Sequence, residues 1–107
     1  MEATNADWKL FRSKLPAWQE AYMDRKNKEY IAILSGEGNP SSKFWALEKR
    51  IKEDKKSPGV RCETSRTDLL YLILGLLHDG AITEEDLNEF SDSLKEAVQT
   101  HLAFMKE

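Results

Sequence analysis

The fold is decided by the stretch TDLLYLILGLLHD, which spans residues 67–79. Eight of the nine residues from Leu69 to Leu77 are apolar, so a helix formed here has no polar face for water. Such a helix must be buried by other parts of the protein or by lipid. Lipid is the weaker alternative, because a membrane span needs about 20 apolar residues. The stretch therefore predicts a central buried helix with the rest of the chain packed around it.

Length and composition indicate a small helical protein with a well-solvated surface. The 107 residues suffice for one domain, residues 1–107, with a single core. Charged residues make up 33% of the chain and hydrophobic residues 40%. The segment from Met1 to Asp7 lacks the apolar stretch of a signal peptide. Cys62 is the only cysteine, so no internal disulfide is expected. These features predict a cytoplasmic protein.

The net charge of −3 is distributed unevenly along the chain. Residues 43–66 carry eight basic and four acidic side chains, whereas residues 79–107 carry eight acidic side chains against Lys95 and Lys106. The two segments either face each other within the protein or each face a partner. The sequence leaves both alternatives open.

Helical periodicity extends from Asn5 to Ser35 in spite of Pro16. At about 100° per residue, one apolar stripe continues on both sides of the proline. A proline inside a helix kinks it or starts a new one. We therefore predict a kinked helix, or two closely joined helices, over this range. Gly36 is placed to end it in the left-handed conformation.

A second helix is predicted to begin at Ser41 or Ser42, since either hydroxyl can cap a helix, and to end near Lys56. Its inner stripe is expected to consist of Phe44, Leu47 and Ile51.

The last helix is predicted to begin after Thr83, whose side chain caps it ahead of three carboxylates. Within the central helix, Gly75 costs about 1 kcal/mol relative to alanine, so we expect a close helix crossing there. Gly80 is expected to end the central helix in the left-handed conformation.

Two charged residues, Arg25 and Glu29, interrupt the apolar stripe of the first predicted helix. Their i,i+4 spacing fits a salt bridge at the rim of the core. The functional alternative is a polar notch made by Trp18, Tyr22, Arg25 and Glu29.

The best candidate for a binding surface is a basic face of the second predicted helix. Trp45 points about 100° away from Phe44 and shares its face with Lys49, Lys52 and Lys56. Phosphates or an acidic protein could bind such a ladder. The alternative is a solvated face with lysine stems lying over a half-buried tryptophan. The acidic net charge argues against a dedicated nucleic-acid binder.

A metal site is not indicated by the acidic residues after the central helix. Asp79, Gly80 and Asp86 have the spacing found in the second half of a calcium loop. In that alignment, Gly75 and Leu77 would occupy two positions that need oxygen ligands. The simpler interpretation is a glycine cap and a threonine cap joined by a short turn.

Catalytic patterns are also missing. His78 and His101 lack the i,i+3 or i,i+4 spacing to carboxylates that helical metal sites use. Arg61 and Arg66 are close enough in sequence to lower the pKa of Cys62, but no general base accompanies the thiol. We expect no cofactor and lean against an enzyme.

Two stretches of the chain together resemble a known family. They are LPAWQEAYM at residues 15–23 and KFWALEKRIK at residues 43–52, the latter followed by Pro58-Gly59-Val60. The family consists of small uncharacterised bacterial cytosolic proteins, some of which carry an automatic transporter label. The resemblance implies no known activity and assigns no functional residue. A transporter role for this chain alone is not expected, because no segment is long enough to cross a membrane.

The sequence thus predicts an all-α fold, a compact bundle of four to five helices around residues 67–79. Leu72 and Ile73 are both expected in its core. We expect a non-catalytic protein-interaction or regulatory module that binds another protein or itself. A nucleic-acid-binding protein that uses the Trp45 face is the first alternative, and an enzyme of unknown class is the second.

Overall fold

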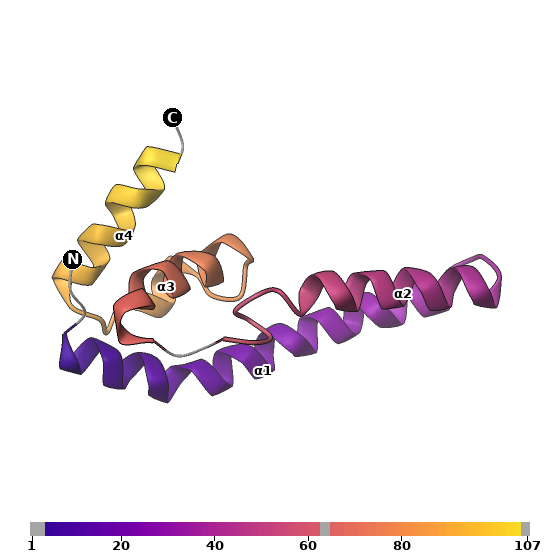
Figure 1. Ribbon diagram of the computed structural model, residues 1–107, viewed down its shortest axis with the longest axis horizontal. Coiled ribbons are helices and arrows are strands. Elements are labelled where there is room, and N and C mark those ends of the chain that lie inside the picture. Colours follow the sequence, from indigo (N-terminus) through magenta and orange to yellow (C-terminus); the bar gives the residue numbers. More distant parts are fainter. Residues whose placement is uncertain (1–3, 63–64, 106–107) are drawn as a thin grey trace.

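The computed structural model describes residues 4–62 and 65–105. Figure 1 shows four α-helices, α1 (Asn5–Ser35), α2 (Pro40–Asp54), α3 (Leu69–His78) and α4 (Asp92–Met105). Two short 3-10 helices, η1 (Arg66–Asp68) and η2 (Glu84–Leu87), precede α3 and α4. No strand occurs in the described ranges, so the all-α prediction is confirmed there. The beginning of the N-terminal stretch discussed above, Met1 to Ala3, lies outside them.

The first helix, α1, has the predicted bounds and continues through Pro16 as one 31-residue helix. Thr4 caps it by accepting a hydrogen bond from the Asp7 backbone at 3.0 Å. Gly36 ends the helix, but the predicted left-handed conformation is wrong there, because its φ of −73° and ψ of −178° are extended. The positive φ, 134°, belongs to Gly38 instead.

The second helix, α2, begins earlier than predicted. Asn39, rather than Ser41 or Ser42, is its cap and accepts a hydrogen bond from the Ser42 backbone at 2.9 Å. Pro40 occupies the first helical turn, where its fixed φ suits the helix and its missing N–H costs nothing. The proline therefore sets the start of α2.

The helices α1 and α2 form an antiparallel hairpin that extends beyond the rest of the protein (Figure 1). The molecule measures 51 × 33 × 21 Å and has a radius of gyration of 16.4 Å. A compact domain of about this length has a radius near 13 Å. The elongation arises because α2 lies alongside the second half of α1, at a distance from α3 and α4.

The core lies at the other end, where α3 and α4 pack on the first half of α1. Its buried apolar residues are Phe11, Leu15, Tyr22, Leu69, Ile73, Leu76, Ala81, Ile82, Leu87, Phe90, Leu94 and Val98.

The third helix, α3, is less enclosed than its sequence predicts. Ile73 is fully buried, as expected, but Leu72 is only half-buried. Tyr71 is 68% exposed, so the expectation of a helix with no face toward water is wrong. Only Leu69, Ile73 and Leu76 of this helix are fully buried, because α1 and α4 cover one side of it.

The close approach predicted at Gly75 is present, but it does not come from a helix. A Cβ atom at Gly75 would lie 3.1 Å from Cγ of Pro58, in the loop that follows α2. The Pro58 carbonyl in turn accepts a hydrogen bond from Nε2 of Gln19 at 3.0 Å. Gly75 thus lets this loop pass between α1 and α3.

The last predicted helix is split in two. Thr83 and Asp86 form a reciprocal capping box, but the turn that they begin is the 3-10 helix η2. The chain then breaks, and α4 starts only at Asp92. Ser91 accepts a hydrogen bond from the Leu94 backbone at 3.1 Å and so caps α4. Gly80 has a φ of 74°, which confirms the left-handed turn predicted after α3.

Candidate functional site

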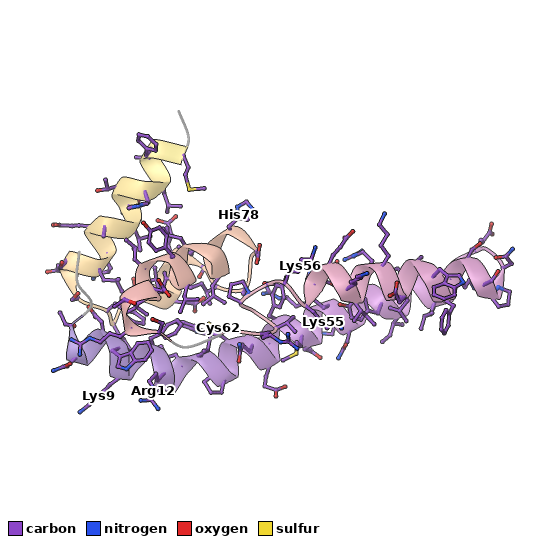
Figure 2. The ribbon with its side chains drawn as sticks, in the orientation of Figure 1. Lys9, Arg12, Lys55, Lys56, Cys62 and His78 are labelled. Carbon is purple, nitrogen blue, oxygen red and sulfur yellow. The ribbon has the colours of Figure 1, made fainter. Side chains whose placement is uncertain are left out.

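The predicted basic face is exposed along the length of α2. Trp45 is 63% exposed, and Lys49, Lys52 and Lys56 are exposed as well. Figure 2 shows Lys56 at the base of the hairpin, while Trp45 belongs to the first part of α2 near its tip. Within the described residues, none of the three lysines has a salt-bridge partner. Their charge is therefore available to a ligand.

The ring of Trp45 contacts Phe44. The two ring centroids lie 5.0 Å apart with an interplanar angle of 85°, an edge-to-face arrangement. Such a pair is favourable beyond its area of contact. Phe44 is itself 62% exposed, so the two rings form an aromatic pair at the surface.

The predicted inner stripe of α2 is wrong in two of its three members. Phe44 and Ile51 are exposed, only Leu47 is half-buried, and no residue of α2 is fully buried. The side that meets α1 is largely polar, and its half-buried residues are Lys43, Leu47, Arg50 and Asp54. The apolar stripe was misassigned because α2 contacts α1 through these polar groups.

Hydrogen bonds and ion pairs hold the hairpin together. Arg50 donates to Glu29 at 2.7 Å, and Tyr30 donates to Asp54 at 2.5 Å. The Arg50 hydrogen bond lowers the pKa of Glu29. Burial, followed by the hydrogen bond to Asp54, raises the pKa of Tyr30. Lys26 lies 3.9 Å from Asp54 and adds a weaker ion pair.

An open groove runs along the apolar residues of α2. It has a volume of about 360 Å³ and is lined by Phe44, Leu47, Glu48, Ile51, Lys52 and Lys55. Ile31 and Leu34 of α1, 62% and 47% exposed, add apolar surface to the same hairpin. The hairpin therefore carries five of the exposed large hydrophobic side chains of the described chain.

The predicted polar notch does not assemble. Trp18 packs against Phe90, with ring centroids 6.3 Å apart. Arg25 lies over the ring of buried Tyr22 and donates to the Gly80 carbonyl, so it stabilises the turn after α3. Glu29 pairs with α2, and the predicted Arg25–Glu29 salt bridge is absent from the described structure. Arg25 and Tyr22 thus contact each other, whereas Trp18 and Glu29 each contact a different part of the protein.

The base of the hairpin is fixed by contacts that the sequence did not reveal. Ser57 donates to Asp79 at 2.6 Å and accepts a hydrogen bond from the Gly59 backbone at 3.1 Å. Gly59 lies against the ring of Tyr22, since a Cβ atom there would be 2.6 Å from the ring. The Pro58-Gly59 pair predicts a turn after α2 but not these contacts with Asp79 and Tyr22.

A polar cavity of about 360 Å³ opens at this base, lined by Tyr22, Lys26, Glu53, Asp54, Lys56, Ser57 and Asp79. Ser57 donates a hydrogen bond to Asp79 in this cavity, and Asp54 accepts one from Tyr30. Ser57, Asp79 and Asp54 thus serve structural contacts, whereas Lys56 also lines the cavity and makes no salt bridge within the described residues.

Other candidate chemistry is not supported by geometry. Burial raises the pKa of the Cys62 thiol, which keeps it protonated and poorly nucleophilic. Nδ1 of His101 lies 3.1 Å from the Ala97 carbonyl, and its ring contacts Tyr71 edge to face. Among residues 4–62 and 65–105, no three His, Cys, Asp or Glu side chains gather to hold a metal ion.

Comparisons with known proteins identify no relative. No protein-family model matches the chain, and neither a curated protein nor a solved structure matches it. The family resemblance stated above thus stays a prediction. Over the described part of the chain, no helix combines the length and apolar character needed to span a membrane.

Proposed function

We propose that this protein is a non-catalytic interaction module and that its binding surface is the α1–α2 hairpin. The observation that carries the proposal is that α2 leaves Phe44, Trp45 and Ile51 exposed. Contiguous exposed apolar surface with a polar rim is typical of protein-binding sites. The rim here is supplied by Lys52 and Lys55 beside the groove.

The contacts that hold the hairpin in place also suit it to binding. Its helices are joined by polar contacts between Glu29 and Arg50 and between Tyr30 and Asp54, so the exposed side chains of Phe44 and Trp45 are left for a partner. Its base is fixed to the core through Ser57 and Gly59. A rigid, projecting surface loses little conformational freedom when a partner binds.

Site-directed photo-crosslinking tests this proposal. A photoreactive amino acid replaces Phe44 in the full chain, and the matched control carries it at Glu20, which is exposed on the first half of α1. We expect protein adducts, either with another protein or with a second copy, from position 44 and not from position 20. Equal yields from both positions would contradict the proposal.

The proposed binding also bears on the predicted compact bundle around α3. We infer that α3 becomes enclosed on all sides only when a partner covers its exposed face at Tyr71. The compact arrangement of helices would then be a property of the assembly.

A second candidate function is single-stranded nucleic-acid binding by Trp45, Lys49, Lys52 and Lys56. It is supported by the exposure of all four residues and by the unpaired charge of the lysines. Trp45 would stack on a base, while the lysines would release counterions from phosphates. Fluorescence anisotropy with labelled single-stranded DNA and RNA tests this at low and moderate salt. Binding that weakens with salt and is lost in Lys49→Glu with Lys52→Glu would support it, whereas no binding at low salt would exclude it.

A further inference from the structure

The two ends of the molecule carry complementary surfaces. The hairpin end presents the exposed pair Phe44 and Trp45. The opposite end, formed by α3 and α4, exposes Tyr71, Phe104 and Met105, with Phe104 78% exposed. Figure 1 shows the free end of α2 at the far right of the molecule and α4 at the left, where its C-terminal end lies above α3. One copy therefore cannot bring its own two surfaces together.

The surface between α3 and α4 contains a receiving crevice. It has a volume of about 270 Å³, and its lining combines five apolar residues with three polar ones: Leu74, Leu77, Ile82, Leu102 and Met105, and His78, Thr83 and Glu84. We call this feature the α3–α4 crevice. Its lining is mainly aliphatic, so it suits an aromatic side chain.

Charge differs between the same two ends. From Asp24 to Lys56, across the hairpin, there are nine basic and six acidic side chains. From Asp79 to Glu107 there are eight acidic side chains and two lysines. Two hairpins packed on each other would bring like charges together, whereas a hairpin packed on the α3–α4 end pairs opposite charges.

We propose that the hairpin of one copy docks on a second copy of this chain, with the Phe44–Trp45 pair in the α3–α4 crevice. This inference rests on the proposed function, because it assigns the partner of the hairpin. Aromatic anchors in apolar pockets are the usual centre of a protein interface, and the opposite net charge of the two segments favours this pairing. The contact is head-to-tail, so each copy keeps one surface open and further copies add as a ring or a filament.

Two surface variants and their mixture test the arrangement. The hairpin variant carries Phe44→Ser and Trp45→Ser. The crevice variant carries Met105→Ser, at a residue that lines the crevice, with Phe104→Ser next to it in sequence; all four positions are exposed. Circular dichroism melts check that both fold. In sedimentation velocity, we expect the parent to grow in size with concentration and each variant alone to stay monomeric. An equimolar mixture should form a 1:1 dimer, because one intact hairpin meets one intact crevice.

Three outcomes would overturn the inference. They are a parent that is monomeric at all accessible concentrations, a mixture that stays monomeric, and a crevice variant that assembles as the parent does. The last would indicate pairing of hairpin with hairpin. Raised salt should weaken the assembly of the parent, since the charged rim is solvent-exposed. Crosslinks from position 44 to a different protein, with a monomeric parent, would refute this inference but leave the proposed function intact.

Discussion

Ser91 donates both its backbone N–H and its hydroxyl to the carboxylate of Asp7, at 2.9 and 2.6 Å. Asp7 lies in the first turn of α1, and Ser91 caps α4. Asp7 is only 2% exposed, so these two bonds satisfy the oxygens of a buried side chain. The start of α1 is thereby joined to the start of α4.

Replacing Asp7 should therefore destabilise the protein. Asp7→Ala leaves the buried donors of Ser91 without their acceptor, which costs about 1–3 kcal/mol. Urea unfolding monitored by circular dichroism measures the loss. Asp24→Ala is the matched control, because Asp24 makes an exposed pair with Lys28 and no other ion pair or side-chain hydrogen bond among the described residues; its loss should cost less than about 1 kcal/mol. Equal losses would mean that the Asp7–Ser91 contact adds no stability.

Gly59→Ala should destabilise the base of the hairpin. The new Cβ atom would lie 2.6 Å from the ring of Tyr22, which is itself buried, so the ring or the loop must shift. Overpacking of this kind costs about 1–3 kcal/mol. Gly36→Ala is the control, since its Cβ atom would meet only ordinary contacts at 3.4 Å and its φ is negative. A Gly59→Ala protein as stable as the control in urea would contradict the described packing.

The stability of the protein should fall at high pH because of Tyr30. Its pKa is raised in the folded state by burial and by the hydrogen bond to Asp54. In the unfolded chain the pKa of a tyrosine is about 10. The neutral phenol of Tyr30 therefore contributes its full stabilisation below that pH, and this stabilisation is lost as the pH rises further. Urea unfolding at pH 8 and near pH 11 should show a smaller loss for Tyr30→Phe than for the parent. Tyr71→Phe serves as control and should lose as much stability as the parent.

Alanine substitutions at two nearby positions of α3, Ile73 and Tyr71, should lower the unfolding free energy by different amounts. Ile73→Ala removes a fully buried side chain and should cost about 2–5 kcal/mol. Tyr71→Ala removes a side chain that is 68% exposed and should cost much less in a dilute, monomeric sample. Equal losses in urea would show that α3 is enclosed on all sides, as its sequence alone predicts.

Local signals predicted much of the fold. The bounds of α1 followed from one apolar stripe on both sides of Pro16, and the turn at Gly80 followed from the need for a positive φ. The break before α4 was not predicted, because its cause is a contact between residues 84 positions apart. An aspartate in the first turn of a helix is ordinarily explained by its interaction with the helix dipole at the surface. The sequence around Asp7 therefore did not indicate that this side chain is buried.

The candidate site was predicted only in part. Helical spacing predicted one face for Trp45, Lys49, Lys52 and Lys56. All four are exposed, but α2 ends at Asp54, so Lys56 lies in the turn after the helix and a common binding face for the four stays a prediction. The same periodicity assigned Phe44 and Ile51 to a core that α2 does not have. Periodicity shows which residues share a face, but not whether another helix covers that face. Here α1 meets a polar stripe instead, through Glu29 and Tyr30.

The central claim is that the apolar side chains of the hairpin serve binding rather than folding. Its most direct test is the unfolding free energy of Phe44→Ser with Ile51→Ser, compared with that of Phe11→Ser in the core. Because both hairpin residues are exposed and Phe11 is fully buried, we predict a change within about 0.5 kcal/mol per hairpin substitution and a loss of about 3–5 kcal/mol for Phe11→Ser. A hairpin variant that loses as much stability in urea as Phe11→Ser would contradict the account.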